Sequence, residues 1–211
     1  MTALQPSEGA GRVFLLNGVP RAGKSSIARA LQDQLGTPTV NLGVDLARAA
    51  TPPDLQPGVG LRPGGERPDL EPFIAAHYGA LFDSIAANAK QGINVAADFG
   101  IHDAYSRPLG IWEDAAERLA DIPVHVVGVR CSLDVVLARR AAEADRYESA
   151  IDGEVPAAVI RWEQAVHEPG WYDVEVDTSV LSPEECARHL LGLANDRPPT
   201  ALQRHRGGGL A

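Results

Sequence analysis

Short apolar runs alternate along this chain with longer stretches in which apolar residues recur every three or four positions. The runs predict buried strands over residues 12–17, 39–44, 93–97, 124–129 and 172–177. The recurring positions predict helices over 24–35, 46–50, 70–90, 110–120, 156–166 and 183–194, and a further helix from residue 132. Strands that alternate with helices predict βαβ units. We therefore expect an α/β fold with a parallel sheet of about five strands and helices on both faces.

The length of 211 residues fits one domain, which we expect to span residues 12–194. Residues 1–11 and 195–211 are polar or glycine-rich and lack apolar periodicity, so both ends are predicted to be disordered. Within the domain, the segment 51–69 is rich in proline and glycine and interrupts the helical pattern. A long loop of this kind in a compact domain is usually functional or disordered.

The stretch between the first strand and the first helix matches the phosphate-loop pattern G-x-x-x-x-G-K-[ST] without a mismatch. Its residues are Gly18, Val19, Pro20, Arg21, Ala22, Gly23, Lys24 and Ser25, followed by Ser26. Backbone N–H groups of such a loop point at phosphate oxygens, the lysine reaches the β- and γ-phosphates, and the hydroxyl coordinates magnesium. A chance glycine-rich turn is disfavoured, because a strand ends directly before the pattern and a helix begins inside it. The sequence therefore predicts a site for ATP or GTP with Mg²⁺, without specifying the base.

Two aspartates follow strands that end on the same side of the predicted sheet. Asp45 is our candidate for the base that accepts the hydroxyl proton of a phosphate acceptor; the alternative is an N-cap for the short helix after it. Asp98 is our candidate for a magnesium-binding acid, with Asp103 as a weaker rival, and its alternative is a strand-terminal turn residue. The chain has no Asn-Lys-x-Asp motif of a GTPase switch. These features favour a small-molecule kinase over a switch or a motor ATPase.

Three arginines, Arg139, Arg140 and Arg146, follow the clearest predicted strand, 124–129. In small kinases this position is a lid, whose arginines close over the phosphates and stabilise charge as the γ-phosphoryl group leaves. We therefore predict a lid over residues 139–155. The alternative is a solvated charged helix, because acidic residues are interleaved with the arginines at pairing distances.

Histidines and aromatic residues give weaker signals. Four histidines do not cluster with cysteines at metal-ligand spacing and are predicted to lie in the core or on the surface: His77, His102, His125 and His167. Four aromatic residues are predicted individually as core residues: Tyr78, Phe99, Tyr105 and Trp112. Together with the segment 51–69, these aromatic residues could still line a cavity for the acceptor.

Several further stretches stand in a fixed order along the chain. They are Gly-Val-Asp at 43–45, Val-Gly-Val-Arg-Cys at 127–131, Asp-Arg at 145–146, His-Glu at 167–168 and Tyr-Asp-Val-Glu-Val-Asp-Thr at 172–178. With Leu-Leu-Asn-Gly at 15–18 and Ala-Gly-Lys-Ser at 22–25, the chain resembles the chloramphenicol phosphotransferase family of P-loop kinases. The phosphate loop is shared by many families, whereas the stretches at 127–131 and 172–178 are far more specific. The likeness spreads over residues 12–190, nearly the whole domain.

The resemblance implies a P-loop NTPase fold, similar to nucleoside kinases, and an enzyme that phosphorylates a hydroxyl group of an antibiotic, often as self-protection. It also implies that Asp45 is the catalytic base and that Arg139 and Arg146 are lid arginines acting with Lys24 in catalysis. Asp177 and Thr178 are expected near the nucleotide base. We expect Arg140 to contribute to nucleotide binding.

This chain departs from the family pattern at Pro20 and Arg21, at Ala97 where a second acid is expected, at Glu143 in the lid, and in the segment 51–69. That segment would border the acceptor, so the acceptor stays open between chloramphenicol, a nucleoside antibiotic and another antibiotic with a free hydroxyl group. Two alternatives to an antibiotic phosphotransferase are a kinase of an ordinary metabolite and a nucleotide-dependent regulatory or binding protein.

Composition narrows the partners and the compartment. The formal net charge of −9 argues against a nucleic-acid partner. Residues 1–11 lack a secretion-signal pattern, and no apolar run approaches the roughly 20 residues of a membrane span. Cys131 and Cys186 cannot form a disulfide framework. We therefore expect a cytoplasmic protein with no nucleic-acid or membrane partner. The oligomeric state stays open, with a homo-oligomer as one possibility.

Overall fold

One parallel sheet forms the centre of the protein. The fold is known from a computed structural model, which describes residues 5–6, 9–56, 67–142, 157–168 and 170–206. The strands are β1 (Val13–Asn17), β2 (Thr39–Asn41), β3 (Asn94–Phe99), β4 (Val124–Arg130) and β5 (Val174–Asp177). They lie in the order β2-β3-β1-β4-β5, and every pairing is parallel. The predicted five-stranded parallel sheet is confirmed, with β1 in the middle.

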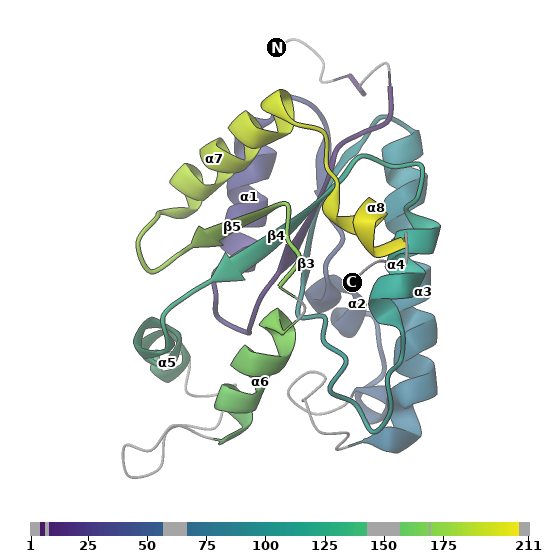
Figure 1. Ribbon diagram of the computed structural model, residues 1–211, viewed down its shortest axis with the longest axis vertical. Coiled ribbons are helices and arrows are strands. Elements are labelled where there is room, and N and C mark those ends of the chain that lie inside the picture. Colours follow the sequence, from purple (N-terminus) through teal and green to yellow (C-terminus); the bar gives the residue numbers. More distant parts are fainter. Residues whose placement is uncertain (1–4, 7–8, 57–66, 143–156, 169, 207–211) are drawn as a thin grey trace.

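Helices cover both faces of the sheet, as predicted (Figure 1). One face carries α1 (Lys24–Gln34) and α7 (Pro183–Asp196), and the other carries α3 (Glu71–Lys90), α4 (Ile111–Arg118) and α8 (Ala201–Arg206). The remaining helices are α2 (Val44–Ala49), α5 (Leu133–Ala141) and α6 (Ala157–His167), with short 3-10 turns at Pro53–Leu55 and Pro68–Leu70. Since α2 and α5 follow β2 and β4, they lie near the end of the sheet where the strands stop.

The alternation of side chains along β1 explains why its sequence is continuously apolar. Val13 and Leu15 pack into the layer that contains α3 and α4, whereas Phe14 and Leu16 pack into the layer that contains α1 and α7. Successive strand residues point to opposite faces, so a strand covered on both sides has no polar face. β1 is therefore held from both sides where the phosphate loop leaves it.

The strand order brings the candidate residues together at one edge of the sheet. Leu16 pairs with Asp98 on β3, and Asn17 pairs with Gly128 on β4. The phosphate loop thus emerges between the carboxyl ends of two neighbouring strands. Parallel sheets bind their ligands beyond these ends, where the strand order reverses.

The prediction of a disordered tail from residue 195 is wrong for the described part of that segment. α7 continues to Asp196, and α8 packs against α4. The carboxylate of Asp173 accepts the backbone N–H groups of Thr200 and Ala201 at 2.7 and 2.8 Å, while Ala201 and Leu202 are buried. Six residues are too few to show helical periodicity, and the residue that anchors them is distant in the chain, so no local signal was present.

Parts of several predicted segments lie outside the described residues. These parts are residues 1–4 and 7–8 of the N-terminal segment, 57–66 of the loop, 143–155 of the predicted lid, which includes Arg146, residue 156 of the predicted helix 156–166, and 207–211 of the C-terminal segment. Among the helices that the structure describes, none is long and apolar enough to cross a membrane.

Candidate active site

The phosphate loop connects β1 to α1 as the sequence pattern predicts. A Cβ atom on Gly18 would lie 2.4 Å from the carbonyl oxygen of Val129 on β4, so only glycine fits there. Gly23 has a φ of 92° and begins the first turn of α1 in the left-handed region. Arg21 also has a positive φ of 73°, which is costly for a residue with a side chain. The loop conformation therefore depends on both glycines and tolerates one unfavourable residue between them.

Lys24 bridges the phosphate loop. Its Nζ atom donates to the carbonyl oxygens of Gly18 and Val19, both at 2.8 Å. Burial of the ammonium group lowers the pKa of Lys24 to about 8, although the carboxylates of Asp98 and Asp45 act in the opposite direction. The ammonium group therefore lies close to both candidate acids, in surroundings that an anionic phosphate would stabilise.

Asp98 and Ser25 form the candidate metal site. β3 continues through Phe99, so Asp98 is a buried strand residue, and the alternative of a strand-terminal turn residue is wrong. The Ser25 hydroxyl donates to Oδ2 of Asp98. Oδ1 is buried and has no hydrogen-bond partner among the described residues. A carboxylate and a hydroxyl oxygen fit Mg²⁺, which binds few protein ligands and keeps several waters. The described residues contain no cluster of three or more His, Cys, Asp or Glu side chains that could hold a metal ion.

Gly43 lies directly before α2, and because it has no side chain, the Asp98 carboxylate can occupy the space beside it. A Cβ atom on Gly43 would lie 1.5 Å from Oδ1 of Asp98 and 2.7 Å from its backbone oxygen. This explains the glycine of the Gly-Val-Asp stretch at 43–45 in physical terms: it lets the segment that carries Asp45 approach β3.

Gly43→Ala is therefore expected to lower the free energy of unfolding by about 1–3 kcal/mol, the usual cost of overpacking, and to displace Asp98 from Ser25. Urea unfolding and magnesium-dependent nucleotide binding would measure both effects. Gly192→Ala is the matched control, because Gly192 lies in α7 and a Cβ atom there would meet no neighbouring atom within 4 Å. There alanine should stabilise by roughly 0.5–1 kcal/mol. Equal effects of the two substitutions would contradict the steric argument.

Asp45 lies in the first turn of α2, on the exposed side that faces the phosphate loop cavity. The N-cap of α2 is Gly43, and no side chain caps this helix end. The alternative of an N-cap role for Asp45 is therefore wrong. A carboxylate in the first turn still stabilises the helix, because it interacts favourably with the helix dipole. Its solvent-facing position leaves it available to a ligand.

Arg139 is held against the phosphate loop. Its guanidinium group donates to the carbonyl oxygen of Arg21 at 3.1 Å and to Oγ1 and the carbonyl oxygen of Thr178 at 3.1 and 2.9 Å. The Thr178 hydroxyl in turn donates to the Ala22 carbonyl at 2.7 Å. The described part of the predicted lid thus joins the back of the loop to the end of β5.

Not all predicted nucleotide residues meet in the cavity. Asp177 accepts hydrogen bonds from the backbone and the hydroxyl of Ser179, which lowers its pKa, and so it orders the turn after β5. Asp177 and Arg140 do not line the cavity, and Val19 and Ala22 are buried beneath it. Contact with a nucleotide base therefore stays a prediction for Asp177 and Thr178.

A cavity of about 530 Å³ joins the phosphate loop to a second, largely apolar region. The predicted residues on its wall are Gly18, Pro20, Arg21, Gly23, Lys24, Ser25, Ser26, Asp45, Asp98 and Arg139. Sequence reasoning had also named Tyr78 and Phe99 as candidates for an acceptor cavity, and both line it, whereas Tyr105 and Trp112 pack in the core.

Other wall residues were missed by sequence reasoning. They come from α2, α3 and α6: Val44, Ala47, Arg48, Phe73, Ile74, His77, Leu81 and Trp162. Thr51, Leu55 and Gln56 also line the wall, and they belong to the segment 51–69 that was expected to border an acceptor cavity. On α3, the signal was the helical spacing of the apolar residues, which is the same for a core face and for a cavity wall. Only the tertiary structure shows which part of that face is left uncovered.

The geometry can be compared with known proteins. The family model of chloramphenicol phosphotransferase-like proteins matches residues 11–194. The chain belongs to this family. Proteins from two strains of Mycobacterium tuberculosis, whose names describe them provisionally as O-phosphotransferases, are each 31% identical over 194 residues, which is 85% of this chain and 80% of the relative. The resemblance inferred from the motifs is thereby confirmed, and this member of the family is a kinase-like phosphotransferase.

Solved structures of P-loop kinases share the fold. An APS kinase of Mycobacterium tuberculosis, in complex with AMPPNP and APS, has a TM-score of 0.56 and 19% identity, covering 89% of this chain and 99% of that one. A shikimate kinase of Acinetobacter baumannii, in complex with shikimate, has a TM-score of 0.56 and 15% identity, covering 90% and 95%. At these identities the likeness concerns the fold alone. The ligands of this protein are therefore inferred from the residues of its own site.

Proposed function

We propose that the protein transfers the γ-phosphoryl group of ATP or GTP, with Mg²⁺, to a hydroxyl group of a small-molecule antibiotic and thereby inactivates it. One observation carries the proposal: the phosphate loop and Asp45 line the same cavity, whose remaining walls are mostly apolar. The family membership supports an O-phosphotransferase, and the apolar walls support an acceptor with an apolar body.

The phosphate half of the cavity supplies positive charge and hydrogen-bond donors. Lys24 would exchange its bonds to the loop carbonyls for bonds to the β- and γ-phosphates, as the P-loop lysine does. Arg139, at the edge of the loop, adds a second cation beside the phosphates. Ser25 and Asp98 would hold Mg²⁺, which neutralises phosphate charge when bound.

In the proposed reaction, the hydroxyl group of the acceptor would lie between Asp45 and the γ-phosphate. The acceptor oxygen forms a bond to the γ-phosphorus, the bond from that phosphorus to the bridging oxygen breaks, and the hydroxyl proton moves to the Asp45 carboxylate. Apolar side chains from α3, such as Phe73 and Leu81, would bury the body of the acceptor. The products are a nucleoside diphosphate and a phosphorylated alcohol.

Nucleotide affinity should fall as the pH rises above 8. Burial holds the pKa of Lys24 at about 8 in the free protein, and bound phosphates would raise it. The complex then binds its proton more tightly than the free protein, so affinity is complete below pH 8 and is lost above it. Calorimetry should give a Kd at pH 9 about tenfold higher than at pH 7. In Lys24→Arg, nucleotide binding should be weaker, but its Kd should stay constant between pH 7 and pH 9, because a guanidinium group does not titrate in this range. A constant Kd in the unmodified protein would contradict the argument.

The function itself is tested by a phosphate-transfer screen with Mg²⁺ and either ATP or GTP. Hydroxyl-bearing antibiotics, including chloramphenicol and nucleosides, are incubated beside common sugars and metabolites, and products are detected by the mass gain of one phosphoryl group. Transfer to an antibiotic is the expected result. Transfer only to metabolites would replace the antibiotic by a metabolite as acceptor, and nucleotide hydrolysis with no acceptor would overturn the transferase.

A further inference from the structure

The carboxyl end of α6 is bonded to the strand that carries the phosphate loop. Asn17, the last residue of β1, is fully buried, and its Nδ2 atom donates to the carbonyl oxygen of Val166 at 3.1 Å and of Ile101 at 3.3 Å. Its Oδ1 atom accepts the backbone N–H of Ile101 at 2.7 Å. The Asn17 side chain therefore links the end of β1, directly before the phosphate loop, to α6 and to the segment after β3.

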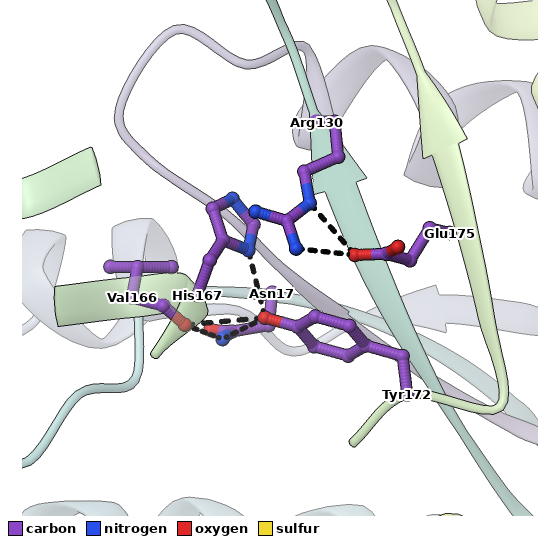
Figure 2. A network of polar contacts seen from close by, with 6 residues as sticks. All are labelled: Asn17, Arg130, Val166, His167, Tyr172 and Glu175. Carbon is purple, nitrogen blue, oxygen red and sulfur yellow. Dashed lines mark hydrogen bonds and ion pairs between the residues drawn. The ribbon is translucent and has the colours of Figure 1, made fainter. Parts of the chain in front are cut away.

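Tyr172 completes this connection (Figure 2). Its hydroxyl group donates to the Val166 carbonyl at 3.2 Å, lies 2.8 Å from Nδ1 of His167, and accepts from Nδ2 of Asn17 at 3.4 Å. The Tyr172 ring packs on Gly128, where a Cβ atom would lie 2.6 Å from the ring. Burial lowers the pKa of His167 to about 4, with Arg130 and Lys24 acting in the same direction. The His167 imidazole is therefore neutral at physiological pH, and its contact with the Tyr172 hydroxyl group does not depend on protonation of the ring.

Trp162 lies one helical turn before this anchored end and lines the cavity. Its side chain is more than nine-tenths buried, and Nε1 has no hydrogen-bond partner among the described residues. A Cβ atom on Gly100 would lie 3.7 Å from Nε1 and 3.4 Å from the Gly18 carbonyl oxygen. The indole N–H thus lies near Gly100, which is two residues beyond Asp98 and which also approaches the start of the phosphate loop.

We propose that Trp162 is a specificity-determining residue of the acceptor site: its ring forms a wall against the acceptor, and its N–H donates to an acceptor oxygen. We also propose that Asn17 and Tyr172 are positioning residues, which fix the end of α6 and hence the place of the indole relative to the phosphate loop. The inference rests on the proposed function. A buried donor without a partner is unfavourable in the free protein, and a ligand oxygen would satisfy it.

Trp112 shows why the position of Trp162 matters. It too is buried with an unpartnered N–H among the described residues, but it packs edge-to-face against Trp171 at 4.7 Å and does not line the cavity. Phenylalanine at either position removes the N–H and part of the ring. Trp112→Phe is therefore a matched control for the general cost of losing a buried indole.

The test is steady-state transfer kinetics with the acceptor that the screen selects, chloramphenicol being the first used. Trp162→Phe should raise the acceptor KM about tenfold and leave the nucleotide KM within twofold, since losing one hydrogen bond and part of a contact is worth about that factor. Trp112→Phe should leave both within twofold. An unchanged acceptor KM in Trp162→Phe, or a change confined to the nucleotide KM, would overturn the role of Trp162.

The anchor is tested without any acceptor. Tyr172→Phe keeps the ring on Gly128 but removes the hydroxyl group. In protein labelled with 5-fluorotryptophan, the ¹⁹F resonance of Trp162, assigned by its loss in Trp162→Phe, should move in Tyr172→Phe, while that of Trp112 stays. An unmoved Trp162 resonance would overturn the positioning role. If the unmodified protein phosphorylates no acceptor at all, the proposed function fails, whereas this measurement still decides the anchor.

Discussion

Replacing Lys24 with alanine is expected to abolish phosphoryl transfer, with a loss of about a thousandfold or more in kcat/KM. The ammonium group already spans the phosphate loop through its bonds to the Gly18 and Val19 carbonyls. The carboxylates of Asp98 and Asp45 both act to raise the pKa of Lys24, so the ammonium group lies within their electrostatic reach. Without it, the two carboxylates would face the triphosphate with less compensating charge, so both nucleotide binding and the transition state should suffer. Coupled detection of the nucleoside diphosphate measures the loss.

The other lysine of the chain provides the control. Lysine occurs only at positions 24 and 90, and Lys90 is exposed at the last turn of α3. Lys90→Ala should therefore leave activity within twofold, because it lies far along α3 from the cavity wall. Substantial turnover by Lys24→Ala would contradict the assignment of residues 18–25 as the phosphate-binding loop.

Replacing Asp45 with asparagine should lower kcat by about a hundredfold or more, the usual contribution of a general base, and should leave nucleotide binding nearly unchanged. Asparagine has the same shape but cannot accept the hydroxyl proton of the acceptor. The carboxylate lies on the exposed side of the first turn of α2 and does not cap the helix, so the fold should tolerate the change. Burst and steady-state transfer assays, together with a nucleotide titration, separate the two effects.

Asp54→Asn is the matched control for this substitution. Asp54 is exposed in the 3-10 turn that follows α2 and does not line the cavity. It should keep full activity. A near-normal kcat in Asp45→Asn would show that Asp45 is not the general base. Its remaining role would then be the interaction with the end of α2.

The two substitutions divide the cavity as the structure does. In the proposed function, Lys24 belongs to the loop that binds the donor nucleotide, and Asp45 belongs to α2, which contributes to the wall of the apolar half. Loss of the first should affect the donor nucleotide, while loss of the second should affect the chemical step alone. A different division would show that the halves are assigned to the wrong ligands.

Much of this architecture is set by short-range sequence patterns. The apolar run at 12–17 predicted β1 because a strand covered on both faces needs apolar residues at every position. Gly36, with a φ of 64°, follows the end of α1 where a glycine stop was expected, and Ser182 begins α7 with a capping box. The phosphate loop was equally legible, since its glycines are required by the local backbone and by the closeness of β4.

The sequence by itself determined the strands and most of the helices, the phosphate loop and the family, because each depends on residues that are adjacent or regularly spaced in the chain. Only the tertiary structure decided that Gly43 makes room for Asp98, that Asp173 anchors α8, and that Trp162 lines the cavity. These features join segments tens of residues apart, and the same residue types would suit a turn, a tail or a core. Long-range packing alone selects between such roles, since burial and steric fit are properties of the whole fold.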